Sequence, residues 1–415
     1  MKLFRKITAF LFAAVLALMV SVTVYAHDIP SFSESGKIIS VAHSGDTMSY
    51  PKNSLAAIQS AFELGADCVS IDIKRTADGY FVLSQSDELG NISLEGSGMV
   101  ISKLPLSQIT SLHLTDKSGK PSEHLITDLQ TVLQAAIAYD KTVIIDGEWE
   151  SREQVYKFIC DNNANNNAII RTDAPKKEIA SFITATSSMC RVIGEYHGNI
   201  IFSARSYITS LSKAGCSMIF LGTKNSFGVI FRNGVISAFS KTGYSARAAM
   251  KTYDMNESGT RPDCESTWSD IIDRGYSVIE TDRIADLVSY LDKLSAERQE
   301  LSALVSQAKS VESAFLTVQS RKDIETALKD AEHSLTTISS ADTLSLQKSR
   351  LNLALNNKVF TDSADKSSQG VFKVTAGKIA AIVIVLFVFI AVQIYFYYKQ
   401  ADKKLPPWLK KLLHK

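Results

Sequence analysis

The sequence predicts an α/β fold, namely a (β/α)₈ TIM barrel with a C-terminal helical-bundle stalk and one transmembrane helix. Three observations predict it. Short apolar runs alternate with amphipathic segments through residues 37–292, Gly and Pro disappear from residues 296–358, and residues 379–398 carry no charge. A chain of 415 residues is long enough for one large domain and a smaller module.

The barrel is predicted from eight strand-length apolar runs. These are Ile38–Ala42, Cys68–Ile73, Thr142–Ile145, Ala168–Ile170, Arg191–Gly194, Ser217–Leu221, Ala248–Tyr253 and Ser277–Glu280. Helical patterns such as Leu55–Leu64 and Leu129–Ala138 lie between them. Eight such units favour a closed barrel over an open sheet. Residues 88–124 interrupt the alternation, since they are rich in Gly, Ser and short apolar runs without helical periodicity.

Residues 296–358 predict three helices. Leu, Ala, Ser, Lys and Glu dominate this segment and recur at helical spacing. The pattern resembles the three-helix FIVAR modules of bacterial surface proteins, and a structural spacer is the interpretation we prefer. Residues 359–377 are polar and predict a linker.

The N-terminus predicts a signal peptide over residues 1–26. Lys2, Arg5 and Lys6 precede an uncharged run that closes on Val24-Tyr25-Ala26. A basic start, an apolar centre and small residues before the cleavage point are typical of secretory signals. The alternative is an uncleaved anchor, because the run is long enough to span a bilayer.

The C-terminus predicts a membrane anchor. Residues 379–398 lie between Lys378 and Lys399, and residues 399–415 form a lysine-rich tail. The length fits one membrane-spanning helix. The positive-inside rule then predicts a cytoplasmic tail and a cell-membrane location with the barrel on the extracellular side.

Charge and cysteine content exclude some classes of function. Lys and Arg number 45 against 43 Asp and Glu, and no basic stripe appears, so nucleic-acid binding is not expected. The five cysteines are widely spaced and odd in number, which argues against a disulfide framework but leaves one pair possible.

The segment from residue 41 to residue 87 carries the most informative motifs. The residues of this segment that form the motif frame are His43, Gly45, Pro51, Asn53, Gly65-Ala66, Asp72, Thr76 and Asp78-Gly79. This frame resembles the opening of the glycerophosphodiester phosphodiesterase family, which reads His-Arg-Gly, Pro-Glu-Asn-Thr, Gly-Ala, Glu-x-Asp, Thr-x-Asp-Gly and His-Asp. The segment GYSVIETDRIADL at residues 275–287 resembles that family's closing strand.

The resemblance implies a TIM barrel that cleaves glycerol phosphodiesters in lipid or wall-polymer metabolism. In that family two histidines act as general acid and base. A Ca²⁺ or Mg²⁺ ion is held by the Glu-x-Asp pair and a later Glu. The implied partner is a glycerophosphodiester or a glycerol-phosphate polymer.

Several of the implied groups are replaced in this chain. His43 matches the first catalytic histidine, but Gln85 stands at the second, and losing one acid–base partner typically costs about 10²–10⁴ in rate. Among the implied metal ligands Asp72 and Asp146 remain, whereas Ser70 replaces a Glu. The Ca²⁺ or Mg²⁺ site is therefore expected to be weak or absent.

The substrate-binding positions are also altered. Ser44 stands where the family has Arg, and Lys52 where it has Glu. Lys52 and Asn53 are candidate substrate-binding residues. Lys52 either replaces part of the cation's charge by neutralising Asp72 or a bound phosphate, or is an ordinary surface lysine, and Asn53 is also a candidate cap for the first helix.

Two further positions are assigned by alignment. Glu148 falls at the family's Lys position, and Tyr253 at an aromatic position that would face the glycerol.

Two functions follow from this pattern. The first is a membrane-anchored extracellular domain, catalytically impaired, that binds a glycerol-phosphate-type ligand. The alternative is an active metal-dependent phosphoric diester hydrolase acting through His43 with Asp72 and Asp146. The four replacements Ser44, Lys52, Ser70 and Gln85 favour the first.

Overall fold

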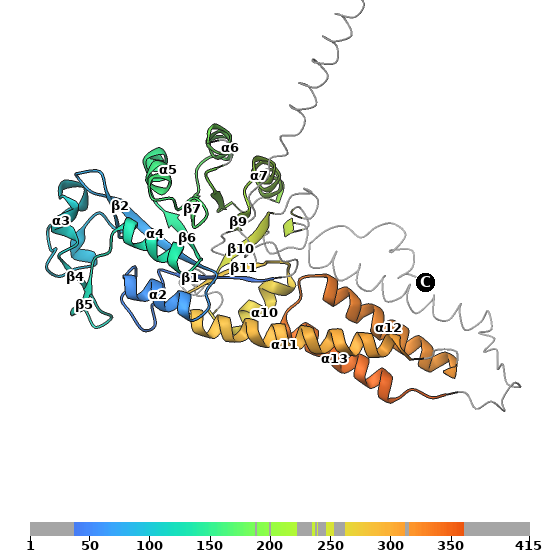
Figure 1. Cartoon of the computed structure of the whole chain (residues 1–415). Coiled ribbons are helices and arrows are strands. Elements are labelled where there is room, and N and C mark those ends of the chain that lie inside the picture. Colours follow the sequence, from blue (N-terminus) through green and yellow to red (C-terminus); the bar gives the residue numbers. More distant parts are fainter. Residues whose placement is uncertain are drawn as a thin grey trace, which may run out of the picture. The chain divides into compact units, whose positions relative to one another are not determined.

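The computed structural model describes residues 37–360, apart from 187–188, 199–200, 222–234, 237–238, 240–245, 253–261 and 312–314. Within these residues the chain builds a parallel barrel, a small insertion and a set of three packed helices (Figure 1).

The strands confirm the predicted barrel. Eight parallel strands of the described chain pair in the order β1-β11-β10-β9-β8-β7-β6-β2, and β1 also pairs with β2, which closes the ring. Their bounds are β1 Ile39–His43, β2 Cys68–Arg75, β6 Thr142–Asp146, β7 Ala168–Thr172, β8 Val192–Tyr196, β9 Met218–Leu221, β10 Arg247–Lys251 and β11 Val278–Thr281.

Helices follow the strands and cover the barrel from outside (Figure 1). They are α2 Leu55–Glu63, α4 Leu129–Ala138, α5 Arg152–Asp161, α6 Lys176–Ala185, α7 Ile201–Ala214, α10 Glu265–Asp273 and α11 Ile284–Lys309. The N-caps of two of them are polar, because Ser54 accepts from the Ala57 amide and Asp128 from the Thr131 amide. The apolar faces of these helices and the outward side chains of the strands form one continuous core.

The interior of the barrel is a separate apolar layer. It consists of Ile39, Val41, Cys68, Ile144, Ile169, Ile193, Met218, Phe220, Ala249 and Val278. Every strand of the ring contributes at least one side chain to it, as expected for a barrel whose centre is packed rather than open.

The segment after β2 forms a small insertion at the mouth of the barrel. Strand β3, Phe81–Leu83, runs antiparallel to β2. A one-turn helix α3, Leu106–Ile109, and a hairpin of β4, His113–Thr115, with β5, Pro121–Leu125, complete it. The insertion has a core of its own: Val82, Leu89, Ile101, Ile109, Leu114 and Ile126.

Three helices, α11, α12 and α13, pack against one another at the C-terminal end of the described chain. Helix α12 spans Val318–Thr336 and α13 spans Ala341–Asn356. Helix α11 is continuous from Ile284 to Lys309, so the predicted boundary between barrel and spacer, residues 292–296, lies inside it. Asp273 at the end of α10 accepts hydrogen bonds from the Ser340 amide and hydroxyl, both at 2.8 Å, which ties the start of α13 to the barrel.

The predicted transmembrane helix, and with it the cell-membrane location, is contradicted by the structure. No helix among the described residues is long and apolar enough to cross a membrane. The longest of them, α11, carries charged residues along its whole length, because it packs one face on other helices and exposes the rest. The segments on which the prediction depended, residues 1–26, 379–398 and 399–415, lie outside the described residues, as does most of the linker.

Candidate functional site

A ring of polar side chains lies directly above the apolar layer of the barrel. Side chains alternate along a strand, so the residue two positions after an inward-facing one also faces inward. These residues are His43 after Val41, Ser70 after Cys68, Asp146 after Ile144, Arg171 after Ile169, Glu195 after Ile193, Lys251 after Ala249 and Glu280 after Val278. They stand at or near the C-terminal ends of the strands, where barrel enzymes carry their chemistry.

Most of the predicted site residues meet in one pocket at this end. A cavity of about 360 Å³ is lined by His43, Lys52, Asn53, Asp72 and Gln85. Side chains of the insertion, among them Leu114 and Lys117, form its opposite wall. The five predicted residues in this pocket extend from His43 to Gln85, which are 42 positions apart in the sequence.

The His43 imidazole is held by a carboxylate. Its Nδ1 lies 2.8 Å from Oδ1 of Asp282, and its side chain is 14% exposed. This contact orients the ring through Nδ1. The N-cap of α11 is Arg283, and Asp282, the residue before it, is bonded to His43.

The turn after His43 explains the glycine of the motif. Gly45 has a φ of +92°, and a Cβ there would lie 2.6 Å from the carbonyl carbon of Ala57. The loop therefore rests directly on helix α2, and a side chain at this position would push the two apart. The glycine positions His43 through this close approach.

Asn53 and Asp72 form a second pair in the pocket. Asn53 has a φ of +57°, and its Nδ2 donates to Oδ2 of Asp72 at 3.3 Å. The predicted helix-capping role of Asn53 is therefore wrong, because its left-handed backbone turns the side chain toward Asp72 while Ser54 caps the helix. Lys52 is exposed at the rim.

Gln85 is exposed at the position of the second catalytic histidine. Its amide can donate and accept hydrogen bonds but has no titrating proton near neutral pH. The pocket therefore contains the imidazole of His43 and the amide of Gln85 at the two positions where the resemblance implies histidines.

One of the implied metal ligands, Asp146, is paired with an arginine. Arg171 of β7 forms a bidentate ion pair with Asp146, in which Nε lies 2.7 Å from Oδ1 and Nη2 contacts Oδ2. The same guanidinium pairs across the barrel with Glu280 of β11. Ser70 donates its hydroxyl to Glu280 at 2.5 Å. Two of the three expected ligand positions, Ser70 and Asp146, are thus committed to protein contacts.

These residues do not fit a divalent cation. A Ca²⁺ or Mg²⁺ site needs several oxygen ligands that are free to face one ion. Here Asp146 is neutralised by a guanidinium and Ser70 is a hydrogen-bond donor, which leaves Asp72 as the one expected ligand on the pocket wall. In the part of the chain that is described, no group of three or more His, Cys, Asp or Glu side chains is placed to hold a metal ion.

The ion network shifts the pKa values of its two carboxyls in opposite directions. Complete burial by itself raises the pKa of Glu280, but Arg171 and Lys251 outweigh it and hold that pKa at about 2. Burial raises the pKa of Asp146 to about 6, although Arg171 opposes the rise. Arg171 and Lys251 lower the pKa of both carboxyls, but the negative charge of Glu280 adds to the rise in the pKa of Asp146.

A second ion pair extends the network around the ring. Lys251 of β10 lies 2.8 Å from Glu195 of β8, and both side chains are largely buried. The Arg171 guanidinium lies 4.7 Å from the centroid of the Phe220 ring. The sequence analysis did not predict three residues of this network, Arg171, Lys251 and Glu280. Each of them follows a run of small or apolar strand residues and lies at the same register in the sheet as the predicted ligands.

Three predicted site residues, Ser70, Asp146 and Glu148, are not among the residues that line this pocket. Glu148 is 63% exposed and pairs with Lys74 at 2.9 Å. Tyr253 lies outside the described residues.

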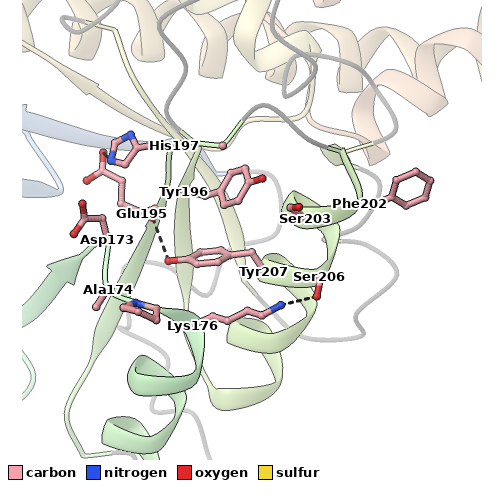
Figure 2. A pocket seen from close by; sticks show the side chains of 12 residues that line it. Asp173, Ala174, Lys176, Glu195, Tyr196, His197, Phe202, Ser203, Ser206 and Tyr207 are labelled. Atoms are coloured by element: carbon pink, nitrogen blue, oxygen red, sulfur yellow. Dashed lines mark hydrogen bonds and ion pairs between the residues drawn. The ribbon is translucent and has the colours of Figure 1, made fainter.

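A larger and more open pocket of about 800 Å³ lies beside β8, between α6 and α7. Figure 2 shows Glu195, Asp173 and His197 on one side of it and Phe202 pointing away on the other. The Tyr196 and Tyr207 rings pack at 5.3 Å between centroids, and the Tyr207 hydroxyl donates to the Glu195 carbonyl at 3.2 Å. Sequence analysis did not predict this pocket.

Comparison with known proteins supports the predicted resemblance. Residues 43–206 match the model of the Glycerophosphoryl diester phosphodiesterase family. The glycerophosphodiester phosphodiesterase of Caldanaerobacter subterraneus subsp. tengcongensis is 36% identical over 84 residues, which are 20% of this chain and 34% of that protein. The chain thus matches about a third of the length of this curated relative.

A solved structure supports the fold. A glycerophosphoryl diester phosphodiesterase from Parabacteroides distasonis has a TM-score of 0.52 and 19% identity, over 64% of this chain and 90% of its own. An Oleispira antarctica phosphodiesterase, solved in complex with the product sn-glycerol-3-phosphate, has a TM-score of 0.48 and 16% identity, over 61% and 96% of the two chains. Over residues 43–206 this chain is therefore similar to the glycerophosphoryl diester phosphodiesterase family, and its described strands close into the TIM barrel.

Proposed function

We propose that the barrel is a glycerophosphodiester phosphodiesterase-like domain that binds a glycerol-phosphate-type ligand and is catalytically impaired. The observation that carries this proposal is that the pocket is lined by one histidine, His43, and by Gln85 at the position where the resemblance implies a second histidine. Cleavage of a phosphodiester with a poor leaving group needs both a base and an acid, and an amide can serve as neither.

The charge of the pocket supports an anionic ligand. Lys52 and Lys117 line it together with the Asn53 amide and the His43 ring. Ammonium groups and amide donors of this kind bind phosphate oxygens. Asp72 and Asp116 also line the pocket, and their carboxylates are suited to accept hydrogen bonds from the hydroxyls of a glycerol unit.

The contacts of Asp146 are a second support. Its carboxylate is held by Arg171, so the negative charge that would recruit a metal is already compensated. We propose on this ground that ligand binding requires neither Ca²⁺ nor Mg²⁺. The ligand would be a glycerophosphodiester or a segment of a glycerol-phosphate polymer.

We also propose that residues 296–358 act as a FIVAR-like spacer attached to the barrel. Support comes from the three described helices in this part of the chain and from the hydrogen bonds between Asp273 and Ser340.

An active hydrolase is the second candidate, and one observation favours it. The His43 ring is oriented by Asp282 at 2.8 Å, an arrangement that makes an imidazole an effective general base. In that function His43 would activate the nucleophile, and another group would have to protonate the leaving oxygen.

Binding and turnover assays on the full chain separate the two functions. Glycerol 3-phosphate is titrated calorimetrically, and glycerophosphocholine hydrolysis is followed with Ca²⁺, with Mg²⁺ and with EDTA. We expect saturable binding without turnover. Lys52→Ala should weaken binding roughly tenfold, whereas Lys177→Ala, which removes an equally exposed lysine on α6, should not. Metal-dependent hydrolysis that disappears in His43→Ala would establish the hydrolase instead.

A further inference from the structure

We propose that Arg171 is a resident cation, meaning that its guanidinium permanently occupies the place between the carboxylates where a divalent metal ion would bind. The inference uses the site of the proposed function but concerns the protein's own charges rather than its ligand. It assigns to Arg171, a residue that the motif comparison passes over, the role of excluding metal.

The contacts of a single nitrogen carry this inference. Nη2 of Arg171 contacts Oδ2 of Asp146 and lies 3.2 Å from Oε1 of Glu280. The Ser70 hydroxyl lies 2.5 Å from the same Oε1. Carboxylate oxygens from β6 and β11 therefore meet at one nitrogen of the guanidinium, and the Ser70 hydroxyl of β2 is bonded to one of these oxygens. Carboxylates converge in the same way on a bound metal ion.

The burial of these side chains explains why a cation is needed beside the two carboxylates. The Arg171 and Glu280 side chains are 2% and 0% exposed, and that of Asp146 is 28% exposed. A buried carboxylate needs a cation beside it, because the loss of hydration otherwise drives it to take up a proton. The guanidinium meets this need for both carboxylates at once, through its planar set of donors.

The local charges also argue against an added metal ion in the native chain. The described network holds three carboxylates, Asp146, Glu195 and Glu280, and two cations, Arg171 and Lys251. A divalent ion placed among them would lie close to a guanidinium that cannot lose its proton. The repulsion in a poorly hydrated interior would be large.

The consequence is that removal of the arginine charge should create a metal site. Replacing Arg171 with Met keeps an unbranched side chain but removes the guanidinium that contacts both Asp146 and Glu280, so that Lys251 is the one remaining cation of the described network. Two carboxylates, the Ser70 hydroxyl and water form a hard oxygen donor set of the kind that Ca²⁺ and Mg²⁺ prefer.

Thermal unfolding of the full chain tests this inference. Wild type, Arg171→Met and Arg171→Lys are melted in EDTA, in Ca²⁺ and in Mg²⁺. We expect the Tm of wild type to be the same in all three solutions, and likewise the Tm of Arg171→Lys, since both proteins keep a positive charge at position 171. Arg171→Met should melt lower in EDTA and gain roughly 3 °C or more with millimolar Ca²⁺.

The double variant Arg171→Met, Glu280→Gln is the control for the site. It lacks one of the two carboxylates, so the Ca²⁺ response should be lost. If Arg171→Met folds only when Ca²⁺ is present, the metal has replaced the charge and the inference holds.

Three results would overturn the inference. They are a Ca²⁺ response in wild type equal to that of Arg171→Met, no response in Arg171→Met, and failure of that variant to fold at every cation concentration. Because the readout is melting and not ligand binding, these results are independent of whether the pocket binds glycerol 3-phosphate.

Discussion

The residue scale is where this barrel departs from its relatives in sequence. The frame that shapes the loops is kept, as the close approach of Gly45 to Ala57 illustrates, while the groups that carry charge are exchanged. Arg171 and Glu280 are both buried, and their charges are balanced inside the protein. Such a pair adds little net stability compared with apolar residues, but it becomes costly when one partner is removed.

The pKa of Glu280 predicts a loss of stability in acid. Its pKa falls from an ordinary value of 4.5 to about 2 in the folded chain. A lowered pKa stabilises the fold above pH 4.5, and this contribution, about 3 kcal/mol, is lost as the pH falls toward 2. Asp146 acts in the opposite sense, since its pKa is raised from 3.8 to about 6 and its contribution is lost as the pH rises through that range.

Urea unfolding measured across these pH values checks the prediction. Glu280→Gln should be destabilised at neutral pH by roughly 3–5 kcal/mol, because Arg171 and Lys251 lose their buried partner, and it should lose the steep acid limb. Glu325→Gln removes an exposed carboxylate of α12 and should behave as wild type. An acid limb that is unchanged in Glu280→Gln would show that another carboxyl is responsible.

Gly45 supports a second prediction at this scale. Gly45→Ala adds a Cβ 2.6 Å from the Ala57 carbonyl carbon at a φ of +92°, so we expect a loss of roughly 3–5 kcal/mol. Gly119→Ala is the matched control, because its φ is +78° but nothing lies within 4 Å of the added atom. It should cost roughly 1–2 kcal/mol. Equal losses in urea unfolding would mean that backbone conformation alone, and not the contact with α2, explains the glycine.

At the scale of elements, the sequence predicted the positions of the strands and the side chains that face inward. It did not predict which charged side chains pair with one another. The apolar runs located all eight barrel strands, and alternation would also place Arg171 and Lys251 on the inner face. Nothing in the sequence pairs Arg171 with Glu280, because β7 and β11 are separated by three other strands in the sheet. The same holds for His43 and Asp282, which only the closure of the barrel brings within 2.8 Å.

The joint between α10 and α13 gives the prediction for elements. Asp273 accepts from the amide and hydroxyl of Ser340 and from the Thr343 hydroxyl, each at 2.8 Å. Asp273→Ala should cost about 2 kcal/mol and increase hydrogen exchange at the start of α13 more than in the barrel strands. Asp161→Ala removes an exposed carboxylate paired with Lys157 and should change stability by less than about 0.5 kcal/mol. Unchanged exchange in α13 would show that this joint is not structural.

At the scale of the molecule, helix α11 joins the barrel to the helices that follow. Its first half buries Ile284, Leu287 and Tyr290, and its second half buries Leu301 and Val305. The Tyr290 hydroxyl lies 3.4 Å from the Ala341 amide of α13, so the first half of α11 also contacts a helix that lies beyond the boundary predicted from sequence. A change of composition marks where a new module begins, but it does not reveal that one helix serves both.

The shared helix predicts that barrel and helices unfold together. Ser295 is an exposed residue in the middle of α11, so Ser295→Pro removes a backbone hydrogen bond and introduces a clash without touching either core. We expect one transition in wild type and in Ser295→Ala, seen alike by tryptophan fluorescence and by circular dichroism. Ser295→Pro should be less stable by about 3 kcal/mol and should separate the two signals. Coincident transitions in the proline variant would mean that contacts such as Asp273 with Ser340, and not the continuity of the helix, couple the two parts.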